Sequence, residues 1–158
     1  MKKLSNYILL IILNIVTYLT YNENNYFFIT KYLTTTRPVD IMFGILFNYL
    51  YLKIYLDNYY YYVLNRNNII VRLGKKKYNL YIIKKILLNT VLIVFLNIIS
   101  DLILTQNINF IYLAINSLLI LFSVIILPKK KTYTNELIIT LVITTLIKVV
   151  LYKLLIIN

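Results

Sequence analysis

The residue types that carry most enzymatic chemistry are scarce in this chain. It has no histidine and no cysteine, so the commonest metal ligand, the usual proton shuttle at neutral pH and all thiol reactions are missing. The acidic residues are scattered, at Glu23, Asp40, Asp57, Asp101 and Glu136, and no two have the spacing of a metal site or an acid–base pair. We therefore expect neither an enzyme nor a bound cofactor.

Polar residues inside apolar stretches are the remaining candidates for a specific role, because an unpaired polar group in hydrocarbon is costly. They recur at helical spacing in two places, and each set therefore occupies one helix face: Thr90, Asn97 and Asp101 in the first, and Thr140, Thr144, Lys148 and Tyr152 in the second. Both faces are expected to turn toward protein or a watery cavity. Asparagines at positions 14, 48, 89 and 116 are expected to form hydrogen bonds between helices.

The depths of the charged residues suggest an intramembrane ion pair. Counted from the starts of their apolar stretches, Asp101 lies at roughly 24 Å, Lys148 at roughly 18 Å and Lys153 near 25 Å, at 1.5 Å per residue. A pair between Asp101 and either lysine would fix the packing of the two helices. In the alternative interpretation, Asp101 faces the headgroups and Lys148 extends its ammonium along the helix to water.

The elements that must position these residues are membrane helices. Hydrophobic residues make up 61% of the 158 residues and charged residues only 14%, which is too apolar for a soluble surface. Five apolar stretches approach the length that crosses a bilayer, at residues 4–21, 39–56, 86–104, 108–127 and 137–157. The sequence predicts an all-α, polytopic membrane helix bundle that forms a single domain over residues 1–158.

The basic residues give this bundle a direction. Thirteen of them lie in alternate connections, and Lys and Arg near span ends favour the cytoplasmic side. This predicts a cytoplasmic N-terminus, an external C-terminus, and a short external loop over residues 22–38 that leads into a helix at Pro38. The two lysines of the fifth stretch leave open that it lies on the membrane surface. A bacterial cell membrane is the expected location, with an organellar inner membrane as the alternative.

The net charge of +12 has an expected partner in the bilayer itself. The basic residues are separated by apolar stretches rather than gathered on one soluble face, which argues against nucleic acid. We expect them to meet anionic lipid headgroups. Because the apolar stretches are bulky and large lipid-like surfaces would remain, association with other membrane subunits or with a second copy is also expected.

The connection over residues 57–85 is the longest inner segment and mixes aromatic, apolar and basic residues. It contains four consecutive tyrosines, at positions 59 to 62, and a basic region around Arg66 and Arg72. One interpretation is a membrane anchor that lies at the headgroup boundary and has no partner. The other is a docking element for a cytoplasmic protein.

The docking interpretation is favoured by a short motif, an Arg-x-Gly-basic-basic segment followed by an aromatic, which consists of Arg72, Gly74, Lys75, Lys76, Lys77 and Tyr78. This motif resembles the coupling region of type-2 ABC exporter permease subunits. The resemblance is to those of bacteriocin or lantibiotic export and self-protection. It implies that this segment and Arg66 contact a cytoplasmic ATPase subunit. The chain departs from that family in its small size and in having five apolar stretches where six are usual.

The function expected from the sequence is therefore a subunit of a multi-protein membrane complex, an ABC-exporter-like permease component without its own ATPase. Gly74-Lys75 lacks the remaining residues of a phosphate-binding loop, so nucleotide chemistry would belong to another chain. The alternative is a noncatalytic membrane interaction protein, such as a bacteriocin immunity protein or a small structural subunit.

Overall fold

The computed structural model describes residues 2–21, 23–31, 37–126 and 133–157. Within these ranges the chain is all-α and has no strand, which confirms the all-α part of the predicted fold class. The described helices are α1 (Lys2–Thr20), α2 (Glu23–Lys31), α3 (Pro38–Leu64), α4 (Arg66–Leu73), α5 (Lys75–Thr105), α6 (Phe110–Ile126) and α7 (Tyr133–Ile157).

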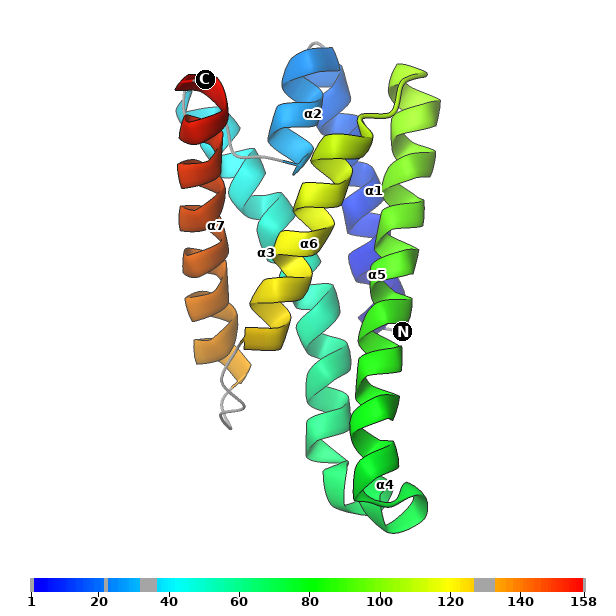
Figure 1. Cartoon of the computed structure of the whole chain (residues 1–158). Helices are drawn as coiled ribbons and strands as arrows, with labels where there is room; N and C mark the ends of the chain where they lie inside the picture. The colour runs from blue at the N-terminus through cyan, green and yellow to red at the C-terminus, as the bar shows by residue number, and fades with distance from the viewer. Residues whose placement is uncertain (1, 22, 32–36, 127–132, 158) are drawn as a thin grey trace.

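The helices form one elongated bundle around α3 (Figure 1), which packs against α1, α2, α5, α6 and α7. The long helices run up and down the bundle axis, and α5 and α6 are antiparallel neighbours joined by a short connection. In Figure 1, the C-terminal ends of α1, α5 and α7 and the start of α3 lie at the upper end. The connection between α3 and α5, which contains α4, lies at the lower end.

The core of the bundle lies around the middle of α3. Four side chains of this helix are almost inaccessible to solvent, those of Phe47, Tyr51, Leu52 and Tyr55. They belong to one cluster with residues such as Leu10 of α1. Every large side chain buried there removes apolar area from solvent, and four helices contribute to the same cluster besides α3. The position of α3 as the common neighbour follows from this concentration of buried aromatic residues.

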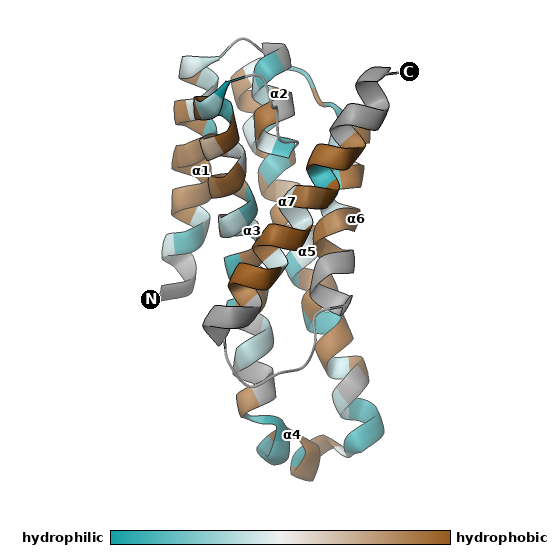
Figure 2. Cartoon of the chain, turned by 90° about the vertical axis from the view of Figure 1, so that its left-hand side faces the viewer, coloured by the Kyte–Doolittle hydropathy of each residue, from teal (hydrophilic) through white to brown (hydrophobic). Residues whose placement is uncertain are grey.

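The outward faces of the bundle are apolar. Leucine, isoleucine and valine side chains of α1, α5, α6 and α7 are exposed along them. Figure 2 shows the middle parts of α1 and α7 coloured mostly as hydrophobic. By length and composition, two described helices could cross a membrane: the Pro38–Asp57 part of α3, and α5. Shorter apolar helices cover Ser5–Thr20, Phe110–Leu121 and Leu137–Leu151.

Two regions differ from the sequence-based expectation. The external loop predicted over residues 22–38 contains a helix, α2, whose residues 26, 27, 29, 30 and 31 are buried in the bundle. The inner connection at residues 57–85 does not form separate elements along a membrane surface, because α3 continues into it without a break to Leu64, α5 begins within it at Lys75, and only α4 lies across their ends. Helix α3 does begin at Pro38, as predicted.

Candidate functional site

The first candidate region is the lower end of the α3–α5 hairpin, which we call the hairpin tip (residues 64–80). Its central element is α4, an eight-residue helix with no buried residue. Gly74 forms the corner between α4 and α5 with a φ of 80°, a left-handed conformation that a residue without Cβ adopts at little cost. The Gly74 N–H donates to the carbonyl of Ile70 at 2.8 Å, and the Tyr78 N–H donates to the carbonyl of Gly74 at 3.0 Å.

The residues that the sequence assigned to docking come together at this tip. Six of them are exposed there, namely Arg66, Arg72, Gly74, Lys75, Lys76 and Lys77. Tyr78 differs, because it is buried. Apolar side chains are exposed beside the basic ones: Leu64 is 82% accessible, Val71 86% and Leu80 67%. The hairpin tip therefore presents a mixed basic and apolar surface that the other described residues do not cover.

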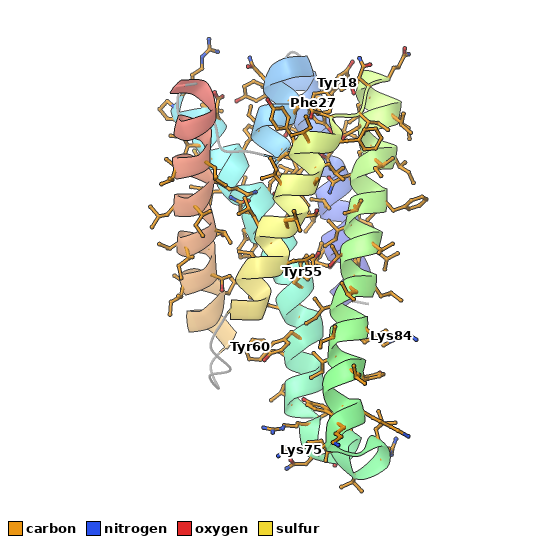
Figure 3. All side chains as sticks on the ribbon, viewed as in Figure 1. Tyr18, Phe27, Tyr55, Tyr60, Lys75 and Lys84 are labelled. Carbon is orange, nitrogen blue, oxygen red and sulfur yellow. The ribbon has the colours of Figure 1, made fainter. Side chains whose placement is uncertain are left out.

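The hairpin tip projects from the bundle. The Asn6 amide of α1 donates to the Asp57 carboxylate at 3.1 Å, which places the first turns of α1 beside this point of α3. Below it α3 continues to Leu64 and α5 begins at Lys75, and Figure 3 shows Lys75 near the extreme end and Lys84 higher along α5. Figure 1 shows no other helix reaching as far as α4.

The second candidate region, which we call the outer polar centre, consists of Asn14, Tyr26, Lys31 and Asp101. The Lys31 ammonium lies 3.0 Å from Asp101 Oδ1, and both side chains are inaccessible to solvent. The Tyr26 hydroxyl lies between two acceptors, 3.1 Å from Asp101 Oδ1 and 3.2 Å from Asn14 Oδ1. Three helices, α1, α2 and α5, meet in this cluster.

The electrostatics of this centre follow from burial. Burial and the neighbouring Asp101 both raise the pKa of Tyr26, so its hydroxyl stays protonated and acts as a donor. Burial lowers the pKa of the Lys31 ammonium, whereas Asp101 acts in the opposite direction. The Lys31 Nζ also lies 5.6 Å from the centre of the Tyr26 ring, within the range of a cation–π interaction.

The described side chains of both polar faces predicted from the sequence turn into the bundle, as expected, and the Tyr152 side chain lies outside the described residues. Thr90, Asn97, Asp101, Thr140, Thr144 and Lys148 are all buried, and so are the four asparagines expected to connect helices. Of these, Asn14 accepts from Tyr26 of α2, and Asn48 and Asn116 accept from Lys148 of α7. Asn97 accepts from the Tyr51 hydroxyl at 2.9 Å.

The predicted ion pair between Asp101 and Lys148 is wrong. Lys148 instead donates to the Asn48 and Asn116 side chains. The reason is helix packing: α7 contacts α3 and α6, whereas the end of α5 that carries Asp101 meets α2. Lys153 belongs to α7, and its side chain lies outside the described residues.

Sequence reasoning missed Lys31 because the segment around it was interpreted as a loop. A signal was present: Tyr26 and Thr30 are four residues apart, as are Phe27 and Lys31, so these residues occupy adjacent parts of one helix face. The run is shorter than any bilayer-spanning stretch, which is why a search for long apolar runs passes over it.

No protein-family model, curated protein or solved structure matches this chain. The function must therefore be inferred from the hairpin tip and the outer polar centre, together with the apolar outer faces. At the hairpin tip and on the outer faces, apolar side chains are exposed. In the outer polar centre, charged side chains are buried at a cost in free energy.

Proposed function

We propose that the chain is an integral membrane protein that crosses the bilayer five times and works as a subunit of a multi-protein complex, an ABC-exporter-like permease component. In this arrangement α1, α3, α5, α6 and α7 cross, and α2 enters from the outer side. The hairpin tip docks a cytoplasmic ATPase subunit. The observation that carries the proposal is the projecting hairpin tip, whose basic and apolar side chains have no cover from the rest of the described chain.

The apolar outer faces support five crossings. Large hydrophobic side chains such as Ile12 of α1, Leu118 of α6 and Leu146 of α7 are at least half exposed, and lipid is the solvent that such contiguous surfaces suit. The start of α1, the end of α6 and the start of α7 all lie toward the same end of the bundle as the hairpin tip. The basic connections predicted to be cytoplasmic therefore adjoin helix ends on one side, as the positive-inside rule requires.

The reach of the hairpin supports docking rather than anchoring. Toward the hairpin tip, α3 extends by about 10 Å from Asp57 to Leu64, at 1.5 Å per residue. On the other side, α5 extends by about 15 Å from Lys85 back to Lys75. Lys84 and Lys85 then lie at the headgroups, and the hairpin tip lies in the cytoplasm. An eight-residue helix without buried residues is marginal on its own, so a partner surface that packs against α4 would stabilise it.

The proposal is tested by purification in mild detergent and identification of the chains that co-purify. We expect a stoichiometric ATPase that is lost when Arg72, Lys75, Lys76 and Lys77 are replaced by alanine. The matched control is Lys84→Ala with Lys85→Ala, which removes basic side chains from the same helix outside the hairpin tip and should leave the ATPase bound. If the quadruple variant retains every partner, the docking assignment fails.

The second candidate function is a noncatalytic membrane interaction protein, such as a bacteriocin immunity protein or a small structural subunit. The packing of the outer half favours it, because Tyr26 and Lys31 of α2 are buried and join α1 to α5 through hydrogen bonds to Asn14 and Asp101. The same purification distinguishes the two functions, because a partner without a nucleotide-binding site would support this one.

A further inference from the structure

We propose that one face of α3 binds a transmembrane helix of a partner subunit, and that this helix carries an aspartate or glutamate opposite Lys53. We call the face the α3 stripe; it consists of Val39, Met42, Leu46, Tyr49 and Lys53. The inference rests on the part of the proposed function that places α3 across the bilayer. It concerns a partner within the membrane, whereas the hairpin tip concerns a partner in the cytoplasm.

The spacing of the α3 stripe is that of a seam between two helices. Its residues follow one another at alternating intervals of three and four, so they form a single line along one face of α3. From Val39 to Lys53 this line extends by about 21 Å, at 1.5 Å per residue. One helix of a partner can pack along it over about four turns.

The α3 stripe is not covered by the described helices. Its first three side chains are between 47% and 64% accessible, and Tyr49 and Lys53 are half-buried. On its other faces α3 is the common neighbour of the bundle, and α1 and α7 are among the helices that pack against it. Figure 2 shows α3 between these two helices. The stripe is therefore a surface of the central helix that remains available to a helix from outside the chain.

Lys53 distinguishes this surface from the outer faces of the other helices. Along the predicted membrane stretches, the remaining charged side chains that the structure describes are buried, namely Asp40, Asp101 and Lys148. The exposed faces of α1, α5, α6 and α7 present large hydrophobic side chains and no charge within the described parts of these stretches, which suits lipid tails. A half-buried lysine there is costly in hydrocarbon and indicates a different occupant.

The depth of Lys53 excludes the headgroups as its partner. Figure 3 shows Lys84 of α5 at about the height of Tyr60 of α3, and Lys84 lies at the headgroups in the proposed arrangement. Lys53 precedes Tyr60 by seven residues, so it lies about 10 Å farther into the bilayer. Its ammonium does not extend back toward the headgroups, because Nζ lies 5.6 Å from the centre of the Tyr49 ring, one turn farther from them. The ammonium therefore needs a partner at hydrocarbon depth.

A carboxylate is the partner that this ammonium favours. The Tyr49 ring provides a cation–π contact, and the structure gives Lys53 no ion pair among the described residues. Charged residues within membranes characteristically pair with one another. Asp57, one turn farther along α3, accepts a hydrogen bond from Asn6 of α1. The countercharge of Lys53 is therefore expected from another helix that packs on the stripe.

Charge also argues against a second copy of this chain as the occupant. Two copies related by a twofold axis along the membrane normal would place the same stripe on both sides of the interface. Lys53 would then face its own counterpart at the same depth, and two ammonium groups repel each other strongly where the dielectric constant is low. A helix with an aspartate or glutamate at that depth avoids this repulsion. The occupant is therefore a different polypeptide.

The first test is photocrosslinking in cells that express the complex, with p-benzoylphenylalanine introduced at single positions. Leu46→p-benzoylphenylalanine, in the middle of the stripe, should crosslink to one membrane polypeptide that is not a second copy of this chain. The matched control is Phe95→p-benzoylphenylalanine, on an exposed and uncharged face of α5, which should not give this adduct. The inference is overturned by a crosslink between two copies, by the same adduct at both positions, or by no protein adduct at Leu46.

The second test measures the charge pairing by purification in mild detergent. Lys53→Met keeps an apolar stem of similar length at a half-buried position, so the bundle should fold, and recovery of the crosslinked partner should fall at least about tenfold. Two controls should leave recovery unchanged: Lys84→Ala with Lys85→Ala, which removes basic side chains at the headgroups, and Glu136→Gln, which removes a carboxylate of this chain from the first turn of α7.

Charge exchange completes this test. Lys53→Asp, combined with lysine in place of the partner's membrane carboxylate, should restore recovery. A partner without a carboxylate in its membrane helix, full retention by Lys53→Met, or a loss of equal size in Glu136→Gln would overturn the inference.

The outcome is separable from that of the proposed function. Lys53→Met should leave the ATPase bound, because Lys53 lies about 16 Å from the end of α3 at Leu64. If Leu46 crosslinks to no membrane partner while the ATPase remains bound, this inference alone fails. If the membrane partner is recovered and responds to Lys53→Met while no ATPase co-purifies, the docking assignment alone fails.

Discussion

Asp101 shows how one buried charge organises the residues around it. A buried ion pair joins it to Lys31, and a buried charge with a good partner is tolerated better than an unpaired one. Tyr26 adds a third polar group on the same carboxylate oxygen. The pair is therefore a specific contact between α2 and α5 that apolar packing alone would not select.

This contact leads to a first prediction. Replacement of Asp101 by leucine leaves the Lys31 ammonium buried without a counter-charge and should lower the free energy of unfolding by about 3–5 kcal/mol. Adding Lys31→Met to the same chain removes the stranded charge and should recover part of the loss. Denaturant unfolding in mixed micelles measures both variants, and a double variant no more stable than Asp101→Leu alone would contradict the pairing.

At this scale the sequence indicated which residues are buried, and it did not indicate their partners. The spacing of Asn97 and Asp101 places them on one helix face, and the cost of polar groups in hydrocarbon turns that face inward. The partner depends on which helix packs there. Lys148 had a suitable depth but belongs to α7, which contacts α3 and α6, so the nearer ammonium of Lys31 forms the pair.

The orientation of α4 depends on the backbone conformation at the corner between α4 and α5. Gly74 has φ 80° and ψ 154°, a combination that residues with a Cβ rarely adopt. A Cβ added at Gly74 would meet nothing within 4 Å, so the requirement comes from the backbone and not from crowding. The glycine of the Arg-x-Gly-basic-basic run thus sets the angle at which α4 lies across the hairpin end.

The second prediction concerns this angle. Gly74→Ala should cost about 1–3 kcal/mol of backbone strain or relax by reorienting α4. Because the bundle core is distant, helix content and the transition of the bundle should stay nearly unchanged, while retention of the docked ATPase falls. Circular dichroism and co-purification measure the two effects. Full retention of the partner would show that the orientation of α4 does not matter for docking.

Helix α2 is the element that could not be derived from the sequence. The Asn-rich stretch before Tyr26 favours a turn. The apolar run that follows is too short for a helix to be predicted from its length. Its helical form depends on burial of Tyr26, Phe27 and Ile29 against the bundle. Tertiary contacts therefore decide its structure, and such contacts are visible only once the other helices are placed.

For the whole molecule, long apolar stretches were the strongest signal. A helix occupies most of each of the five predicted stretches, because continuous Leu and Ile runs leave few alternatives to a buried or lipid-facing helix. The projection of the hairpin was not predicted, since the mixed composition of residues 57–85 suits a headgroup-lying segment equally well. The number of bilayer crossings stays a prediction, because α1, α6 and α7 satisfy the apolar criterion only over shorter lengths.

The last prediction tests this count with single cysteines, since the chain has none of its own and any label on the purified chain marks the introduced cysteine. A membrane-impermeant maleimide added to intact cells should label Asn107→Cys, in the connection after α5. It should not label Lys3→Cys, Asn68→Cys or Lys130→Cys until the membrane is broken, because five crossings place the N-terminus, the hairpin tip and the α6–α7 connection inside. If only α3 and α5 crossed, Lys3→Cys and Lys130→Cys would react from outside together with Asn107→Cys, while Asn68→Cys would stay protected. The pattern of these four positions therefore separates five crossings from two.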